Sequence, residues 1–243
     1  MPTVLILGAA SDMAVAIAHE MAAKGHDLQL AARKTDRLEP LRADLQIRYT
    51  IQCTLHEFDA ENCSQHAAFY EQLPVKPSIA ICVFGYLGEN EKARTDWQEA
   101  ARIIQTNYTG AVSILNVISN DFAARKSGVI VGVSSVAGER GRQSNYIYGS
   151  AKAGFTAYLS GLRNRMFREG VHVMSVQPGF VYTRMTEGLA LPPLLTAQPD
   201  QVAKAISAGI NKKKNIIYVK WFWRWIMMII CLIPEFLFKK LKL

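Results

Sequence analysis

Residues 4–25 read VLILGAASDMAVAIAHEMAAKG, and this stretch indicates how the chain begins to fold. The apolar run Val4–Leu7 is typical of a strand that is buried on both faces. Gly8 follows it at once, and residues 12–24 then carry apolar side chains at helical spacing until Gly25 ends the helix. The stretch therefore predicts a strand, a tight glycine turn and a helix.

The same alternation of strand and helix continues along the chain. Further apolar runs predict strands at residues 28–31, within 49–58, and at 79–84, 129–133, 171–176 and 216–219. Helices are expected at residues 35–46, 95–124 and 145–169. Buried strands separated by helices favour one α/β domain, with a doubly wound parallel sheet of about seven strands and helices on both faces. Ligands of such sheets bind beyond the carboxyl ends of the strands.

The composition is that of a folded, reduced protein with an unusual C-terminus. Half of the 243 residues are hydrophobic, which excludes intrinsic disorder. The net charge is +8, but residues 211–243 hold eight basic residues and one acid, so +7 belongs to this end. A charge confined to one end argues against a nucleic-acid partner. The four cysteines lack paired metal spacing, so no metal site is expected and a cytoplasmic location fits.

Residues after the first two strands favour a dinucleotide site. A glycine after a buried strand lets the backbone approach a pyrophosphate, and Gly8 has this position, although such a turn is also ordinary structure. The place where an acid usually holds the ribose of NAD is taken by Arg33, with Lys34 and Arg37 nearby. Since a basic residue accepts the 2′-phosphate, NADP(H) is favoured over NAD(H). The alternative is a set of solvated charges at a helix start.

The strongest chemical signal combines Tyr148 and Lys152, at i and i+4 on one predicted helix, with Ser135 at the end of a strand. A nearby ammonium group lowers the pKa of a tyrosine, so that the phenol can exchange a proton with a substrate oxygen. Ser135 can hydrogen-bond the same oxygen. Alone, each residue would be ordinary, but together at one end of one sheet they predict a proton-transfer site.

These motifs resemble the short-chain dehydrogenase/reductase family over nearly the whole chain. The resemblance extends to Asn107 on the long central helix, Asp59 after the third strand and residues 178–183, PGFVYT, after the sixth. It implies a Rossmann-type fold and hydride transfer between a nicotinamide and a ketone or secondary alcohol. The catalytic residues that it implies are Asn107, Ser135, Tyr148 and Lys152. In this scheme Lys152 holds the nicotinamide ribose and Asn107 supports a water relay.

The resemblance also implies a set of cofactor-binding residues after the strands: Gly8, Ala10, Ser11, Asp12, Met13, Arg33, Asp59, Gly85, Tyr148, Lys152, Pro178, Gly179, Val181 and Thr183. Two departures are visible. Leu7, Asp12 and Ala14 replace the Thr and two of the Gly residues in the family's glycine-rich pattern, and only Gly85 remains of its N-N-A-G. Asp12 is expected either to weaken cofactor binding or to cap the helix and point away. A non-catalytic dinucleotide-binding regulatory protein therefore remains an alternative.

Residues 220–243 are expected to form a tail attached to a catalytic domain of residues 1–219. No stretch of the tail reaches the ~20 apolar residues that span a bilayer. Its less apolar positions form a narrow stripe on a helix that Pro234 divides: Lys220, Arg224, Met227, Cys231, Glu235, Lys239 and Lys242. Three tryptophans and flanking lysines favour peripheral contact with the inner face of a membrane. The alternative is packing on the domain or on a second subunit.

The substrate is expected to be a small or lipid-linked ketone or alcohol. A lid is predicted at residues 182–199, with an apolar lining of Met185, Leu189, Leu191 and Leu194. The glycine loop and tail more weakly resemble the decaprenylphosphoryl 2-keto-pentose reductases, which implies a polyprenyl-phosphate-linked keto-sugar. Another hydrophobic ketone of the acyl, steroid or retinoid type is the alternative. The family resemblance also implies a homodimer or homotetramer.

Overall fold

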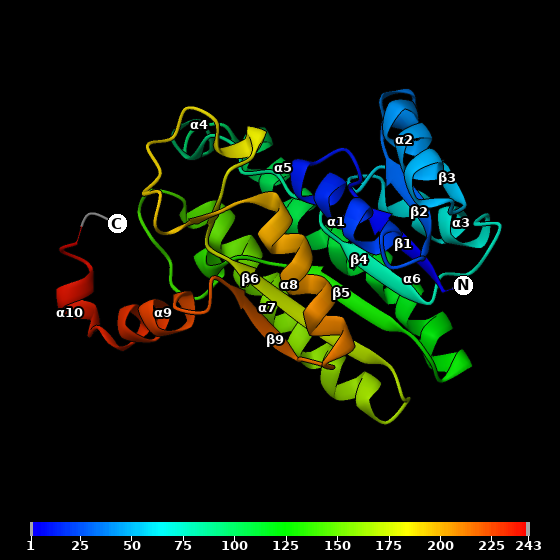
Figure 1. The fold of residues 1–243 in the computed structure, drawn as a ribbon. Helices are drawn as coiled ribbons and strands as arrows, with labels where there is room; N and C mark the ends of the chain where they lie inside the picture. The colour runs from blue at the N-terminus through cyan, green and yellow to red at the C-terminus, as the bar shows by residue number, and fades with distance from the viewer. Residues whose placement is uncertain (1, 242–243) are drawn as a thin grey trace.

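The fold is seen in a computed structural model of the chain, which describes residues 2–241. Its centre is a parallel seven-stranded sheet with the order β3-β2-β1-β4-β5-β6-β9 (Figure 1). The strands are β1 Thr3–Leu7, β2 Asp27–Ala32, β3 Cys53–Glu57, β4 Ile79–Cys82, β5 Val129–Val133, β6 His172–Pro178 and β9 Ile216–Val219. The strand order reverses between β1 and β4, and ligands of doubly wound sheets bind in the crevice at this point.

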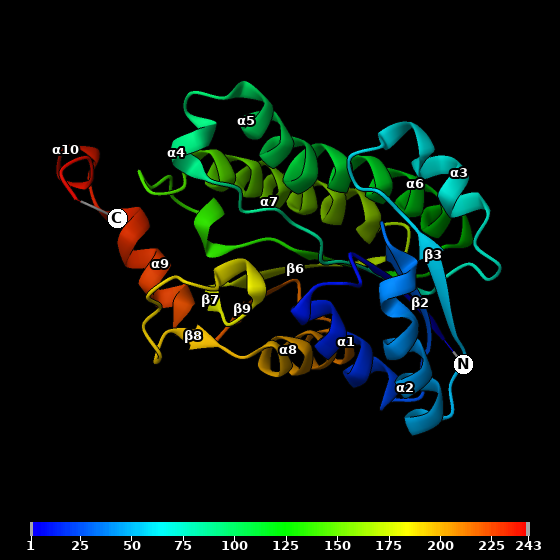
Figure 2. The same ribbon diagram turned by 90° about the horizontal axis from the view of Figure 1, so that it is seen from above.

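Helices cover both faces of the sheet (Figure 2). They are α1 Asp12–Ala22, α2 Glu39–Tyr49, α3 His66–Glu71, α4 Asn90–Ala93, α5 Trp97–Ile104, α6 Gly110–Arg125, α7 Tyr146–Phe167, α8 Pro199–Asn211, α9 Trp223–Leu232 and α10 Glu235–Phe238. A second, two-stranded sheet pairs β7 Phe180–Val181 with β8 Thr196–Ala197. The predicted fold class, a Rossmann-type doubly wound parallel sheet, is confirmed.

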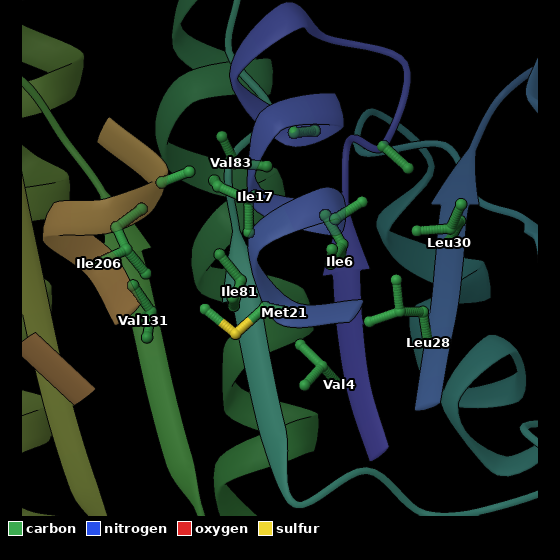
Figure 3. Close-up of a cluster of buried hydrophobic side chains, with 14 of the residues drawn as sticks. Val4, Ile6, Ile17, Met21, Leu28, Leu30, Ile81, Val83, Val131 and Ile206 are labelled. Atoms are coloured by element: carbon green, nitrogen blue, oxygen red, sulfur yellow. The ribbon is translucent and has the colours of Figure 1, made fainter. Parts of the chain in front are cut away.

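Strand β1 shows why both faces of the sheet need cover. Val4 and Ile6 belong to the core beneath α1 and α8, whereas Leu5 and Leu7 belong to the core beneath α6 and α7. None of these four side chains is exposed to solvent. Figure 3 shows the first core, in which α1 lies over β1 and β4. Burial on both faces is the physical reason for the unbroken apolar run in the sequence.

Most predicted elements are present, with informative differences. Strands β5 and β9 have the predicted bounds. The helix predicted at residues 95–124 is divided, because a π-helical turn, Gln105–Thr109, separates α5 from α6. The helix predicted at 35–46 begins as a 3-10 turn, Thr35–Leu38, and continues as α2. Helix α8 was not predicted.

The tail folds into α9 and α10, which Pro234 separates, as predicted. Both helices extend beyond the end of the sheet (Figures 1 and 2). Within residues 2–241, no helix combines the length and the apolar character that crossing a membrane would require.

Of the described residues in the narrow stripe predicted on the tail helix, only Met227 is buried, whereas Arg224, Cys231, Glu235 and Lys239 are exposed. The side that packs against the body is formed by Trp223, Ile226, Met227 and Ile230. Met227 is fully buried, and the Cys231 thiol donates a hydrogen bond to the Glu139 carbonyl oxygen at 3.5 Å. On the other side of the helix, Trp225 and Ile229 are 50% and 62% exposed. Only part of the wide apolar face is therefore left uncovered in the single chain, because Trp223 and Ile230 pack on the body. Lys242, which the prediction included, lies outside the described residues.

Candidate active site

The predicted proton-transfer residues come from two neighbouring elements. Ser135 follows β5 almost directly, and Tyr148 and Lys152 lie one turn apart on α7. Close packing between α7 and the turn after β5 requires glycine, since a Cβ on Gly149 would lie 2.9 Å from the carbonyl oxygen of Ala137. A hydrogen bond joins Ser135 to Tyr148. The fold thus brings the three residues together.

Lys152 is buried, with its ammonium nitrogen 5.8 Å from the centre of the Tyr148 ring. This nitrogen donates a hydrogen bond to the Val133 carbonyl oxygen at 3.2 Å. Ser134 fixes the helix backbone nearby: its hydroxyl donates to the Lys152 carbonyl oxygen at 3.0 Å and lies 2.7 Å from the Thr156 hydroxyl. These bonds hold Lys152 at the end of β5, next to Tyr148.

Burial sets the protonation states of this pair. It raises the pKa of Tyr148 to about 12, although the hydrogen bond with Ser135 acts in the opposite direction. It lowers the pKa of Lys152 to about 8. The prediction that the ammonium group brings the pKa of Tyr148 toward neutrality is therefore wrong for this structure, because desolvation of the phenolate dominates. Tyr148 is a neutral phenol near pH 7, which is the form that can donate a proton.

Asn107 lies in the π-helical turn between α5 and α6. Its amide nitrogen donates to the carbonyl oxygens of Tyr86 at 2.6 Å and Ile103 at 2.8 Å, and its oxygen accepts from the Tyr86 N–H at 3.2 Å. A Cβ on Gly85 would lie 2.9 Å from the Asn107 oxygen and 3.4 Å from the Lys152 ammonium nitrogen. Asn107 therefore lies close to Lys152 and anchors the loop after β4, where the family's asparagines are missing.

A pocket beside α7 is lined by Tyr148, Lys152 and Ser135. Six more of the predicted cofactor-binding residues line it: Met13, Gly85, Pro178, Gly179, Val181 and Thr183. A second pocket is lined by Gly8, Ala10, Ser11, Arg33, Asp59 and Gly85. Because Gly85 and Phe84 line both, the two pockets adjoin. Together they follow the carboxyl ends of the strands, as expected for an extended ligand.

The second pocket has the features that a phosphorylated ligand needs. Gly8 has a φ of +91°, and a Cβ there would lie 2.8 Å from the Phe84 backbone, so only glycine allows this close approach. Arg33, Lys34 and Arg37 all line the pocket and are exposed to solvent. Three cationic side chains on one wall fit an anionic group such as a 2′-phosphate.

Asp12 lines neither pocket, and it does not cap α1. Ser11 is the cap, because its hydroxyl accepts a hydrogen bond from the Ala14 N–H at 3.2 Å. The Asp12 carboxylate instead accepts hydrogen bonds from the Arg184 N–H at 2.7 Å and from its Nε at 3.0 Å. Arg184 also donates to the Ala10 carbonyl oxygen at 2.6 Å. Asp12 therefore has a counter-charge and links the glycine loop to the segment after β7.

The predicted lid, residues 182–199, is only partly a pocket wall. Met185 and Leu189 line the first pocket. Leu191 and Leu194 do not, so this part of the prediction is wrong, and Leu194 is 79% exposed. The chain turns away from the pocket here because β8 pairs with β7 and the Leu195 carbonyl oxygen accepts a hydrogen bond from the indole of Trp223 at 3.1 Å.

Sequence reasoning missed several residues of the first pocket. Arg142, Asn145 and Thr186 line it. Trp223 of α9 also shapes it, because the indole packs so closely on Gly179 that a Cβ there would overlap the ring. Arg142 lies in a loop without a recognised motif, and its nearness in sequence to Tyr148 was the only available signal.

A Rossmann-type sheet that brings a serine, a tyrosine and a lysine to its carboxyl end defines a class of nicotinamide-dependent oxidoreductases. A family model described as short chain dehydrogenase matches residues 2–192. An uncharacterized oxidoreductase of Mycobacterium tuberculosis (strain CDC 1551 / Oshkosh) is 34% identical over 241 residues, covering 98% of this chain and 96% of that protein. The chain therefore belongs to the short-chain dehydrogenase family and is an oxidoreductase.

A second relative and a solved structure are also similar to the chain. An uncharacterized oxidoreductase of Streptomyces coelicolor is 33% identical over 243 residues, covering 98% of this chain and 95% of that protein. The solved structure of a short-chain dehydrogenase from Sphingobium yanoikuyae in complex with NADPH matches with a TM-score of 0.84 and 23% identity. The matched region covers 94% of this chain and 92% of the chain in that structure. This structure shares the fold of the chain.

Proposed function

We propose that the protein is an NADP(H)-dependent reductase of a ketone, or a dehydrogenase of the corresponding secondary alcohol. This proposal rests on one observation: two pockets adjoin each other. One lies beside Tyr148 and Lys152, and the other lies beside Arg33. The first offers a proton donor next to a cation, and the second offers a cationic wall for a phosphate. One extended dinucleotide would fill the second pocket and reach into the first.

When bound, the nicotinamide cofactor supplies a hydride to the carbonyl carbon. Tyr148 donates a proton to the carbonyl oxygen, and Ser135 hydrogen-bonds that oxygen. Lys152 holds the ribose beside the nicotinamide, and Asn107 supports a water relay to Lys152. Gly8, Ala10, Ser11, Met13 and the residues of the PGFVYT segment that line the first pocket form the remaining cofactor contacts.

The preference for NADP(H) over NAD(H) is part of the same proposal. Arg33, Lys34 and Arg37 line the end of the second pocket that follows β2, where an acid would hold the ribose of NAD. The NADPH held by the Sphingobium yanoikuyae relative supports this choice.

Oxidation of NADPH and NADH by a panel of ketones tests the proposal. The panel contains acyl, steroid, retinoid and keto-sugar types, and binding of each cofactor is measured by fluorescence. We expect NADPH to bind more tightly than NADH and at least one ketone to be reduced. Tight NADPH binding without reduction of any ketone would favour the alternative, a non-catalytic dinucleotide-binding regulatory protein.

We further propose that residues 220–243 form a tail that contacts the inner face of a membrane, while residues 1–219 form the catalytic domain. The supporting observation is the exposed apolar side of the tail, formed by Trp221, Trp225, Ile229, Leu232 and Phe236. Lys220, Arg224, Lys239 and Lys240 lie beside it and suit anionic lipid. A membrane contact would suit a lipid-linked keto-sugar as substrate, with another hydrophobic ketone as the alternative. A homodimer or homotetramer is the proposed assembly.

Sedimentation with anionic vesicles tests the tail without deleting it. The variant Trp225→Ser/Ile229→Ser changes exposed side chains only, so Trp223 and Met227 stay in place on the body. Its matched control, Ile47→Ser/Phe167→Ser, changes two body residues that are 84% and 82% exposed. We expect the wild type and the control to sediment with the vesicles and the tail variant to remain in solution. Failure of the wild type to sediment would exclude the membrane role, and equal sedimentation of all three proteins with the vesicles would show that the exposed apolar side of the tail does not make the contact.

A further inference from the structure

The pocket beside Tyr148 is electropositive. Among the described residues that line it, the only charged side chains are Lys152 and Arg142, and none is an aspartate or glutamate. Lys152 donates a hydrogen bond to the Val133 carbonyl oxygen and, in the proposed function, binds the cofactor. Arg142 has no part in the reaction described above. Its charge is therefore the unexplained feature of this pocket.

Among the residues that the structure describes, Arg142 has no close counter-charge. Within residues 2–241, no carboxylate oxygen lies within 4.0 Å of its guanidinium nitrogens. Its one hydrogen bond goes from Nη2 to the Met227 sulfur at 3.1 Å, and a thioether is a weak acceptor. Burial lowers the pKa of Arg142, and Glu139 acts on it only from a distance. Burial raises the pKa of the Glu139 carboxyl, which disfavours its charged form.

Asn145 is a second unsatisfied polar group on the same wall. It lines the pocket three residues after Arg142 and just before the first residue of α7. Its side-chain oxygen is buried and has no hydrogen-bond partner. A buried polar atom without a partner costs stability, so such an atom in a binding pocket points to a ligand. A half-turn of the carboxamide would present its NH₂ group instead.

The tail helix holds this loop in place. Met227 of α9 is fully buried and contacts the Arg142 guanidinium. Two residues earlier in the loop, Arg140 donates hydrogen bonds to the Cys231 carbonyl oxygen at 3.0 Å and to the Glu235 carboxylate at 2.7 Å. These contacts hold the loop that carries Arg142 against α9, and Met227 contacts the guanidinium itself. A guanidinium that is fixed in place loses little entropy when it binds an anion.

We propose that Arg142 and Asn145 form an anion-binding subsite for a phosphate or carboxylate group that the substrate carries away from its reacting carbonyl. The proposal rests on the proposed reductase function and names the class of its substrate. A guanidinium can bind either group with two parallel hydrogen bonds, and Asn145 would add a third contact. The anion can belong to a lipid phosphate or to a soluble phosphate, and the experiment distinguishes these sources.

Calorimetric titration of the full-length protein, saturated with NADPH, tests the subsite. Bound NADPH occupies the Arg33 pocket, so the probes cannot bind there as phosphate analogues. The probes are farnesyl phosphate and farnesol for a lipid source, and glycerol 3-phosphate and glycerol for a soluble source. We expect one phosphate to bind about tenfold or more tightly than its alcohol. Preference for farnesyl phosphate indicates the lipid source, and preference for glycerol 3-phosphate indicates the soluble one.

Variants assign the preference to Arg142. Arg142→Gln should weaken phosphate binding about tenfold to hundredfold and leave binding of the alcohol unchanged, while Arg142→Lys should retain most of the preference. Arg48→Gln is the matched control, because it removes an exposed guanidinium that pairs with Asp44 on α2, away from the pocket. It should retain the preference. Equal affinities for phosphate and alcohol in the wild type, or an equal loss in the Arg48 and Arg142 variants, would overturn the subsite.

These titrations, together with the ketone-reduction assay, distinguish failure of the anion-binding subsite from failure of the proposed reductase function. If NADPH does not bind, the proposed function fails before any probe is added. If NADPH binds and a ketone is reduced, but no phosphate is preferred over its alcohol, the subsite fails and the reductase function stands.

Discussion

Tyr148, Lys152 and Ser135 stand on α7 and at the end of β5, two elements that pack directly on each other, whereas Asp12 and Arg184 join two loops that are 172 residues apart in the chain. The first group is largely buried and held by bonds such as that from Ser134 to the Lys152 carbonyl oxygen. The second is an exposed pair, with Arg184 side-chain exposure at 70%. The reacting end of the site is therefore held by buried hydrogen bonds, whereas the contact at the glycine loop is accessible to solvent.

This difference leads to different expected costs of mutation. In the proposed mechanism, a change at the reacting end removes a group that acts on the transition state. A change at the phosphate end removes a solvent-screened contact that affects cofactor binding alone. The following variants test this comparison, beginning with the largest expected effect.

Substitution of Lys152 by methionine keeps the length of the side chain but removes the ammonium group. We expect kcat/KM for ketone reduction to fall by about a thousandfold, because the cation near the reacting oxygen and the contact with the cofactor are both lost. Steady-state kinetics with NADPH measure the change. Lys204→Met, on the exposed surface of α8, is the control. Activity of the Lys152 variant close to that of the control would remove Lys152 from the mechanism.

Substitution of Arg33 by serine tests the choice of cofactor. The loss of a charge-assisted hydrogen bond to a 2′-phosphate should raise the Kd of NADPH by about tenfold to hundredfold and leave that of NADH unchanged. Fluorescence titration with both cofactors measures it. Arg48→Ser removes a guanidinium that pairs with Asp44 on α2, outside both pockets, and should change neither value. An equal rise in the Kd values of NADPH and NADH would show that Arg33 does not bind the 2′-phosphate.

The pH dependence of reduction distinguishes the two titrating groups of the reacting end. Lys152, with its pKa lowered to about 8, loses its charge as the pH rises through that value, while Tyr148, at about 12, stays protonated. The rate of reduction should be level below pH 7 and fall by about tenfold per pH unit well above 8. Measurement of kcat from pH 6 to 9.5 checks this. A rate that stays level to pH 9.5 would exclude a role for the Lys152 charge.

The smallest effect is expected at the contact between Asp12 and Arg184. Arg184→Ala should weaken NADPH binding by about threefold, because it leaves the Asp12 carboxylate without its counter-charge beside the phosphate loop. Asp12→Asn should restore part of the loss in the double variant. A double-mutant cycle on the Kd of NADPH measures the coupling. Additive effects of the two substitutions would show that the pair is not coupled to cofactor binding.

The same comparison explains how much of the molecule the sequence could predict. Strands β5 and β9 were predicted with their bounds, because runs of buried apolar residues are a local signal. The spacing of Tyr148 and Lys152 is local too, so their position on one face of α7 could be predicted, and their catalytic role stays a prediction. The counter-charge of Asp12 was not, since nothing in the glycine loop indicates that Arg184 lies beside it.

Other parts of the site also depended on distant contacts. Arg142 enters the pocket from a loop that α9 covers, and the position of α9 depends on how Trp223 packs on Gly179. The pattern of the tail predicted a helix with a wide apolar face, but not that Trp223 and Ile230 of this face would pack on the body. The pKa of Tyr148 was predicted to fall because only its neighbour Lys152 was considered, whereas burial, a property of the whole fold, raises it.

The central claim is that Tyr148 donates the proton in an NADPH-dependent ketone reduction. The most direct test measures kcat and the Kd of NADPH side by side for the wild type and Tyr148→Phe, which loses only the hydroxyl. We predict that kcat falls by about 10²–10⁴-fold while the Kd of NADPH stays unchanged. A variant that reduces the ketone at the rate of the wild type would contradict the claim.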